Sequence, residues 1–168
     1  MSYNRILAAI DALPSRSIVF EQALEAAQLH QAELKLLHCV EAEMDPMGPS
    51  VASGVGSPLD VGYLTPSAVE FQVAQKTWEA QIEKATQWLQ DYCQNAAQQG
   101  IIATYEVILE EPGHQICDRA REWQIDLIVV GRQGHSGLTE LLLGSVSNHV
   151  LHHAPCSVLI IQGENALS

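Results

Sequence analysis

Residues Asp126 to Gln162, DLIVVGRQGHSGLTELLLGSVSNHVLHHAPCSVLIIQ, carry the most informative pattern of the chain. The segment begins with four consecutive large aliphatic residues, Leu127 to Val130. Such an uninterrupted apolar run is typical of a strand that is buried on both faces of a parallel sheet. The run stops at Gly131. The sequence therefore predicts a central strand of an α/β fold that ends at a glycine.

A glycine loop follows this strand and leads into a helix. Gly131 and Gly134 are separated by two residues, and Gly144 and Ser145 come directly before a helix-like run at 146–153. The whole pattern is Gly-x2-Gly-x9-Gly-Ser. A helix N-terminus after such a loop presents backbone N–H groups, which can hold a phosphate without help from a lysine. We therefore predict an anion-binding loop between this strand and the helix that begins near residue 146.

Strands and helices alternate along the rest of the chain. Short apolar runs predict strands, and apolar residues at steps of three and four predict helices. Further strands are expected at 3–11, 32–40, 101–109 and 157–161, with helices around 20–27 and 116–123 and a long amphipathic helix at 69–98 that ends before Gly100. Alternation without an internal repeat favours a five-stranded parallel sheet with helices on both faces.

The segment GRQGHSGLTELLLGSVSNHVLHHAPCSVLII resembles the nucleotide-binding signature of the universal stress protein family. RILAAIDALPSRS and DLIVVG stand where that family has its first and fourth strands, and the resemblance is weakest over residues 42–67. It implies a Rossmann-like α/β three-layer sandwich with a five-stranded parallel sheet in the order 3-2-1-4-5. The crevice between strands 1 and 4 would bring Asp11 beside Gly131.

The resemblance also implies roles for individual residues. Asp11 would hold the ribose or adenine side of a nucleotide, and the backbone near Val40 would meet the adenine. Gly131, Arg132 and Gly134 would wrap the ribose and the first phosphates, while the outer phosphates would be held by Gly144, Ser145, Val146 and Ser147. From the residues alone, Asp11 could equally cap a turn or a helix, and Arg132 could be a solvated loop residue. Ser145 is expected to cap its helix in either case.

Other phosphate-binding motifs are absent from the sequence. The turn after the first strand has no G-x-G-x-x-G, and the chain has no G-x-x-x-x-G-K-[ST]. None of the three lysines, Lys35, Lys76 and Lys84, is expected near the glycines. The charge of a triphosphate must then be met in another way, and we expect Mg²⁺ or Mn²⁺ to accompany ATP.

Several side chains that could suggest other chemistry are interpreted as structural. The aromatic residues of the long helix are expected to pack against the core rather than to form a ligand cage. Three histidines near residue 150 suit the negative end of a helix dipole better than a metal site. The four cysteines form no C-x-x-C pair and are expected to be reduced. These residues are Trp78, Trp88, Tyr92, His149, His152, His153, Cys39, Cys93, Cys117 and Cys156.

Composition and charge narrow the protein's class. A chain of 168 residues with 47% hydrophobic residues is expected to fold as one domain, 1–168. Its formal net charge of -12 argues against binding to nucleic acid or to an anionic membrane, both of which require basic patches. No apolar run approaches the roughly 20 residues that span a bilayer. We expect a cytoplasmic protein.

Residues 42–67 differ from the rest of the chain, because they carry four glycines and four prolines with little apolar periodicity. A loop of this length is usually either functional or disordered. Its place after the second strand puts it at the same edge of the sheet as the glycine loop. It is expected to be flexible, either as a lid or partner-binding flap or as plain disorder.

Together these features predict an adenine-nucleotide-binding protein, taking ATP or AMP, that serves as a stress-response signalling or binding module. The alternatives are a weak ATPase or self-phosphorylating enzyme, and a nucleotide-independent chaperone-like protein. No catalytic residue is evident, so at most slow ATP hydrolysis is expected. The strand at 156–162 would lie at the edge of the sheet, which predicts a homodimer through this strand.

Overall fold

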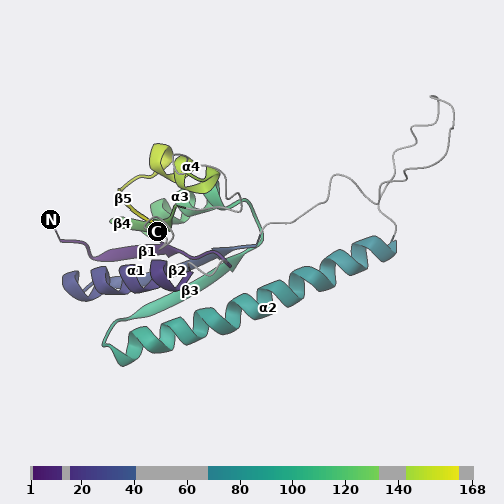
Figure 1. The fold of residues 1–168 in the computed structure, drawn as a ribbon, viewed down its shortest axis with the longest axis horizontal. Helices are drawn as coiled ribbons and strands as arrows, with labels where there is room; N and C mark the ends of the chain where they lie inside the picture. Colours follow the sequence, from purple (N-terminus) through teal and green to yellow (C-terminus); the bar gives the residue numbers. More distant parts are fainter. Residues whose placement is uncertain (1, 13–15, 41–67, 133–142, 163–168) are drawn as a thin grey trace, which may run out of the picture.

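The computed structural model describes residues 2–12, 16–40, 68–132 and 143–162. They form one five-stranded, all-parallel sheet in the order β3-β2-β1-β4-β5, with helices on both faces (Figure 1). The predicted fold class and strand order are confirmed. The strands are β1 (Arg5–Ala9), β2 (Glu33–Cys39), β3 (Ala103–Ile108), β4 (Leu127–Gly131) and β5 (Ser157–Ile161). The helices are α1 (Arg16–His30), α2 (Ala68–Gln98), α3 (Pro112–Glu122) and α4 (Ser145–His153).

The centre of the sheet is formed by β1, which pairs with β2 on one side and with β4 on the other. Leu7 lies opposite Lys35 of β2 and Ile128 of β4. The start of this pairing is fixed by Asp126, whose carboxylate oxygen Oδ2 accepts the N–H groups of Asn4 at 2.7 Å and Arg5 at 3.0 Å. Because all five strands are parallel, their carboxyl ends lie at the same edge of the sheet.

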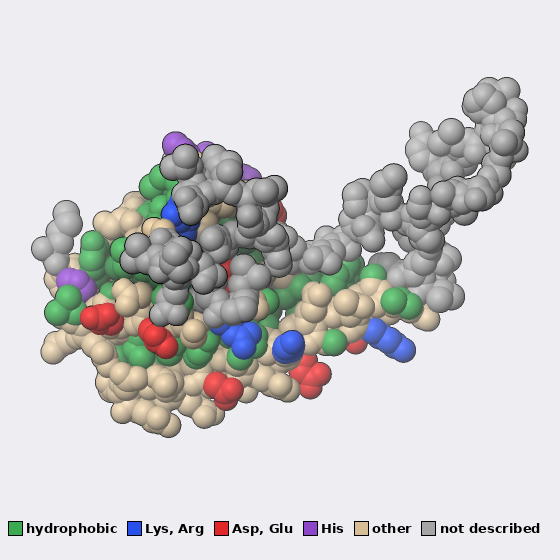
Figure 2. All heavy atoms as spheres, viewed as in Figure 1, with side chains coloured by type: hydrophobic (Ala, Val, Ile, Leu, Met, Phe, Trp, Pro, Cys, Tyr) green, Lys and Arg blue, Asp and Glu red, His purple; other side chains and the backbone are tan. Residues whose placement is uncertain are grey.

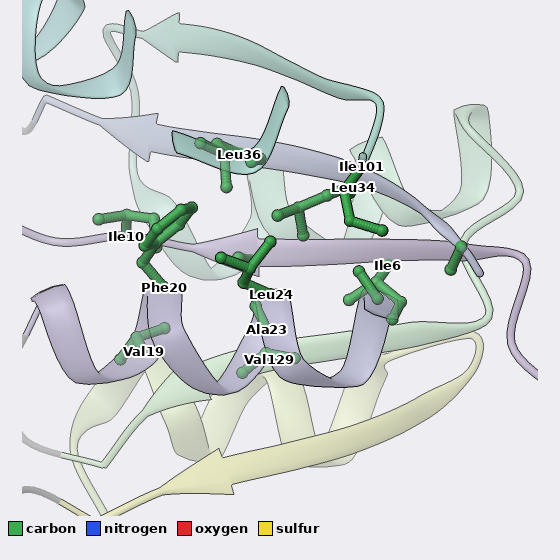
Figure 3. Packing of buried hydrophobic residues seen from close by; sticks show 14 of the residues in the cluster. Ile6, Ile10, Val19, Phe20, Ala23, Leu24, Leu34, Leu36, Ile101 and Val129 are labelled. Atoms are coloured by element: carbon green, nitrogen blue, oxygen red, sulfur yellow. The ribbon is translucent and has the colours of Figure 1, made fainter. Parts of the chain in front are cut away.

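One face of the sheet is covered by α1 and part of α2. Side chains at steps of three and four along α1, including Phe20 and Leu24, point onto the sheet (Figure 3). They meet aliphatic residues of β1, β2 and β4, and each such buried side chain contributes roughly 1.5–3 kcal/mol. The residues of this cluster labelled in Figure 3 are Ile6, Ile10, Val19, Phe20, Ala23, Leu24, Leu34, Leu36, Ile101 and Val129.

The opposite face is covered by α3 and α4, which pack on Leu7, Leu37 and Ile128. The two helices approach closely at Gly113 of α3. A Cβ atom added there would lie 3.0 Å from Cγ of His149 on α4. Glycine at this point lets the two helices approach without crowding His149, although alanine is the better helix former.

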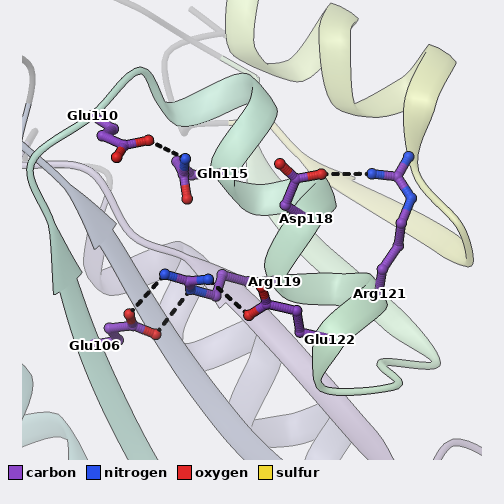
Figure 4. Close-up of polar contacts among 7 residues, drawn as sticks. All are labelled: Glu106, Glu110, Gln115, Asp118, Arg119, Arg121 and Glu122. Carbon is purple, nitrogen blue, oxygen red and sulfur yellow. Dashed lines mark hydrogen bonds and ion pairs between the residues drawn. The ribbon is translucent and has the colours of Figure 1, made fainter.

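Ion pairs and hydrogen bonds tie α3 to its neighbours (Figure 4). Arg119 bridges Glu106 of β3 and Glu122 of its own helix, at 3.1 Å and 2.7 Å. Arg121 pairs with Asp118 and also donates to the carbonyl oxygen of His153, the last residue of α4. At the start of the helix, Gln115 donates to Glu110. These contacts hold α3 between the edge strand β3 and the C-terminus of α4.

Three of the turns that follow helices contain residues with positive φ. Gly100, predicted to end the long helix, has φ +80° and follows α2 by two residues. Gln31 after α1 and Gln124 after α3 adopt similar values, 54° and 53°, without being glycine. The left-handed conformation costs a residue with a Cβ atom roughly 1–2 kcal/mol. These two glutamines are therefore held in place by the packing around them.

Helix α2 differs from the other helices in its length and position. It runs along β3 and extends beyond the end of the sheet (Figure 1). Ala85, Leu89 and Ala96 are its buried residues among those described. No helix in the described residues is both long enough and apolar enough to cross a membrane. Residues 42–67, predicted to form the flexible loop, lie outside the described residues, and the single-domain organisation stays a prediction.

Candidate functional site

A cavity of about 380 Å³ lies at the carboxyl ends of the strands. This size falls in the range of small-molecule pockets, roughly 300–1,000 Å³. Its walls come from the ends of β1, β2 and β4, from the first turn of α4, and from one face of α2. The residues used below are Ile10, Asp11, Arg16, His38, Cys39, Val40, Gln81, Lys84, Ala85, Trp88, Gly131, Gly144, Ser145, Val146 and Ser147.

The structure brings most of the predicted site residues together in this cavity. Asp11, Val40 and Gly131 line it together with the four residues Gly144 to Ser147. Arg132 is not among the lining residues. Gly134 lies outside the described residues. The predicted proximity of Asp11 and Gly131 thus follows from β1 and β4 being neighbours in the sheet.

The end of β4 and the start of α4 are fastened to each other. The hydroxyl group of Ser147 donates a 2.6 Å hydrogen bond to the carbonyl oxygen of Gly131. The N–H of Gly144 donates to the carbonyl oxygen of Arg132 at 3.1 Å. The N–H of Arg132 donates to the carbonyl oxygen of Ile161 at 2.8 Å. The first turn of α4 is therefore held against the end of the sheet.

The prediction that Ser145 caps α4 is wrong. Gly144 occupies the N-cap position, and no side chain accepts a hydrogen bond there. Ser145 is the first helical residue, because the first backbone bond of the helix runs from the N–H of Asn148 to the carbonyl oxygen of Gly144. An exposed serine at this position lies one residue too late to reach the orphan N–H groups.

The first turn of α4 lines the cavity, and its N–H groups receive no cap from the described residues. Within the described parts of the chain, the N–H groups of Ser145, Val146 and Ser147 have no hydrogen-bond partner. The positive end of the helix dipole lies at the same place. Such an arrangement attracts an anion, and the lining of the cavity gives that anion room.

At the end of β2, the backbone groups of Cys39 and Val40 point toward different neighbouring strands. The N–H of Val40 donates to the carbonyl oxygen of Ile108 on β3 at 2.7 Å. The backbone groups of a strand point alternately to its two neighbours. Leu37 bonds to β1, since its carbonyl oxygen accepts from Ile10, so Cys39 also faces the β1 side. The resemblance pointed to the backbone near Val40, and this alternation distinguishes Cys39 from Val40 within that stretch.

A third wall, which sequence reasoning missed, is formed by α2. Gln81, Lys84, Ala85 and Trp88 occur at helical spacings and line the cavity together. The expectation that no lysine lies near the glycines is therefore wrong for Lys84, which lines the same cavity as Gly131. The helical spacing to Trp88 was available in the sequence, but nothing in it showed which face of α2 meets the sheet edge.

Trp88 packs against the hydrophobic core, as expected, and also lines the cavity. Its ring packs at a steep angle against Tyr92, with centroids 5.8 Å apart, and the guanidinium of Arg16 lies 5.2 Å from its ring centroid. Arg16 also lines the cavity. Figure 2 shows basic side chains close together where α2 approaches the body of the molecule. Positive charge is thus present at the site in an otherwise acidic protein.

His38 is a further lining residue that the sequence did not single out. It belongs to β2 and is one of the two polar side chains buried among the described residues. Its Nδ1 atom lies 2.7 Å from the carbonyl oxygen of Ile10, and its ring meets the ring of Trp88 edge-on. Burial lowers the pKa of His38 below 6.5, so the imidazole is neutral at pH 7.

Within the described residues, no group of three His, Cys, Asp or Glu side chains is arranged to hold a metal ion. His149 stacks on His153 and contacts His114 on α3, with centroid distances of 4.2 Å and 4.3 Å. Burial and the charges of these two histidines lower the pKa of His149. A divalent cation at the cavity would be held chiefly by the phosphate groups of its ligand.

A parallel sheet in this order, with a cavity at the carboxyl ends of β1 and β4, places the chain among the Rossmann-like α/β proteins. The model of the universal stress protein family matches residues 2–162. The chain belongs to the universal stress protein family. Universal stress protein Sll1388 of Synechocystis sp. is 33% identical over 162 residues, which cover 96% of this chain and 99% of that protein.

Solved structures agree with the fold. Universal stress protein UspA from Lactobacillus plantarum is 27% identical and covers 96% of this chain and 99% of its own, with a TM-score of 0.75. A family member from Arabidopsis thaliana, solved with AMP bound, is 18% identical and covers 98% of this chain and 94% of its own, with a TM-score of 0.59. At that lower identity the likeness shows the fold alone.

Proposed function

We propose that this protein binds an adenine nucleotide, ATP or AMP, in the cavity and serves in the cytoplasm as a stress-response binding or signalling module. The observation that carries the proposal is the first turn of α4. Its N–H groups lack a partner within the described residues and open onto a cavity of ligand size. The AMP bound to the related Arabidopsis protein supports an adenine nucleotide as the ligand.

The position of the anion site orients the proposed ligand. The phosphates lie at Gly144, Ser145, Val146 and Ser147, where the N–H groups can bind their oxygens. The nucleoside then lies toward the ends of β1 and β2, beside Asp11 and the backbone of Cys39. Gly131 lies between these two ends. Arg132 and Gly134 stay predicted ligand residues of the glycine loop.

In this proposal, positive groups on two walls of the cavity interact with the negative charge of the phosphates. The dipole of α4 acts from one wall, and the ammonium group of Lys84 acts from the wall formed by α2. Mg²⁺ or Mn²⁺ would accompany ATP through its phosphates, as such ions commonly do. AMP carries less charge and requires no cation.

The oligomeric part of the proposal concerns β5. This strand lies at one edge of the sheet, paired on its other side with β4. Its residue Leu159 is an exposed large hydrophobic residue. Pairing of two copies through β5 would satisfy the open backbone groups and cover this side chain. We therefore propose a homodimer through the strand at 156–162.

The binding proposal is tested by Gly144→Val. Gly144 has φ -59° and ψ 159°, values that valine adopts without strain, so its replacement fills space without distorting the chain. Gly131 is less suitable, because even a Cβ atom there would lie 3.3 Å from Val19. Thr104→Val on the far edge strand, with an exposed side chain, is the matched control.

Ligand released from the purified protein is identified by mass spectrometry, and the affinities for ATP and AMP are measured by calorimetry. We expect an adenine nucleotide from the wild type, with binding that Thr104→Val keeps and Gly144→Val loses while its melting temperature is retained. Equal binding by all three proteins would contradict the site. Phosphate release at many turnovers per minute would instead support the alternative of an ATPase.

A further inference from the structure

His38 is built into the wall of the cavity. It is 8% exposed and lies on the same face of β2 as Leu34 and Leu36, the face that α1 and α2 cover. Its ring lies against the edge of Trp88, with centroids 5.1 Å apart and an angle of 74° between the planes. Strand and helix thus fix the position of the imidazole from two sides.

One nitrogen of this imidazole is committed to the protein. Nδ1 lies 2.7 Å from the carbonyl oxygen of Ile10. A carbonyl oxygen can only accept a hydrogen bond, so Nδ1 must carry the proton. In the neutral ring the other nitrogen, Nε2, then has no proton and is a hydrogen-bond acceptor.

That second nitrogen faces open space. No buried side-chain nitrogen or oxygen of the described residues lacks a hydrogen-bond partner. Within the part of the chain that the structure describes, His38 makes no hydrogen bond other than the one to Ile10. Nε2 must therefore be accessible. Because the residue lines the cavity and is otherwise buried, its accessible part belongs to the cavity.

We propose that His38 is the residue by which the cavity recognises the base, through a hydrogen bond from the exocyclic amino group of a 6-aminopurine to Nε2. This inference rests on the proposed nucleotide function. It follows from the orientation above, since the phosphates at α4 leave the base on the side of β1, β2 and α2, where His38 lies.

The proposal includes rejection of 6-oxopurines. Hypoxanthine and guanine present an oxygen at the position where adenine presents its amino group. An oxygen and a bare ring nitrogen are both acceptors, so one buried polar group is left unpaired. Sites built to receive a hydrogen bond discriminate strongly against ligands that cannot provide it. We expect AMP to bind at least about tenfold more tightly than inosine monophosphate.

The charged groups around His38 define how this preference depends on pH. Asp11 at the end of β1 and Arg16 on α1 act on its charge, and Lys84 on α2 lines the same cavity. Burial keeps the imidazole neutral at pH 7, but acid adds a proton to Nε2 and turns the acceptor into a donor. The ratio of the two affinities should therefore fall in acid. Both ligands carry the same phosphate, so an effect of pH on phosphate binding cancels in the ratio of their affinities.

The experiment compares AMP and inosine monophosphate by calorimetry at about pH 7.5 and about pH 5. The proteins are the wild type, His38→Leu, His38→Gln and the exposed control His152→Gln. In the wild type and the control we expect the preference for AMP near pH 7.5, with a decline only where the pH falls below the lowered pKa of His38. His38→Leu should lose the preference, and His38→Gln should restore part of it, since an amide can donate to Ile10 and still accept.

Equal affinities of the wild type for both ligands, or an unchanged ratio in His38→Leu, would overturn this proposal and leave the nucleotide site standing. Failure of the wild type to bind either ligand would overturn both proposals. The wild-type comparison of the two ligands needs no variant, so equal affinities there would overturn the proposal even if His38→Leu did not fold.

Discussion

The hydroxyl group of Ser147 on α4 donates a 2.6 Å hydrogen bond to the carbonyl oxygen of Gly131 at the end of β4. Ser147 is 2% exposed, and the bond is partly buried at the edge of the cavity. It joins the strand on which the glycine loop begins to the helix at which the loop ends. The Ser147 hydroxyl therefore positions the first turn of α4, where the proposed ligand would place its phosphates, and the N–H of the same residue has no partner within the described residues.

The first prediction concerns this bond. Ser147→Ala should lower the free energy of unfolding by about 1 kcal/mol, because the carbonyl oxygen of Gly131 loses its partner at a partly buried position. Nucleotide affinity should fall as well, since α4 is no longer held in position. Ser145→Ala is the matched control for stability, because the Ser145 side chain is exposed and makes no capping bond. Urea denaturation and calorimetry measure both effects, and equal stability of the two variants would contradict the argument.

The second prediction concerns the wall formed by α2. Lys84→Gln should weaken ATP binding by roughly threefold to tenfold and AMP binding by less, because ATP brings more negative charge to the same cation. The difference should shrink as salt is added. Lys76→Gln is the control, since Lys76 lies on the same helix and does not line the cavity. Equal losses with both nucleotides would show that Lys84 does not act on the phosphates.

The third prediction isolates backbone strain at the end of α2. A Cβ atom at Gly100 would meet no atom within 4 Å, so Gly100→Ala changes only the backbone preference at φ +80°. We expect a loss of about 1 kcal/mol in the free energy of unfolding. Gln98→Ala, an exposed change two residues earlier, should leave the stability unaltered. A denaturation midpoint for Gly100→Ala equal to that of the control would refute the strain argument.

The fourth prediction concerns the two edges of the sheet. Leu159→Lys on β5 should convert a dimer to a monomer at micromolar concentration, as measured by light scattering. Tyr105→Lys on β3 should leave the dimer intact, although the two side chains are almost equally exposed, at 38% and 37%. If the wild type is a monomer, or if both variants behave alike, the proposed interface is wrong.

The fifth prediction follows from the lowered pKa of His38 and His149. Below about pH 6.5 the unfolded chain takes up protons that these histidines do not accept in the folded protein. Stability should therefore decrease as the pH falls below 6.5, until the folded pKa values are passed. The slope is at most about 1.4 kcal/mol per pH unit for each histidine. His38→Gln should reduce this slope, whereas Thr104→Val, which changes no titratable group, should not.

Much of the fold could be predicted from the sequence, because runs of apolar residues indicate directly which segments are buried. The aliphatic run of β4 and the glycine at its end mark a central strand, and Gly100 marks the end of α2 by its conformation. Gln31 and Gln124 take the same conformation with no signal in their residue type. Their positions are fixed by packing, which a local pattern does not contain.

The candidate site was predictable where it follows the glycine pattern and not where it depends on register. Asp11 and Gly131 meet because the strand order fixes them. The choice between Val40 and Cys39 depends on which neighbour each residue of β2 bonds to. Lys84 and His38 reach the cavity through the rotation of a helix and the side-chain alternation of a strand in three dimensions.

The hydrogen bond between the N–H of Arg5 and the carboxylate of Asp126 joins residues 121 positions apart. During synthesis β1 leaves the ribosome early and can pair at once with β2, but its other edge must wait for β4. Pairings between such distant segments form slowly, and the unpaired apolar strand is exposed to aggregation in the meantime. The central strand β1 is thus the first of the five strands to be synthesised and among the last to be paired on both edges.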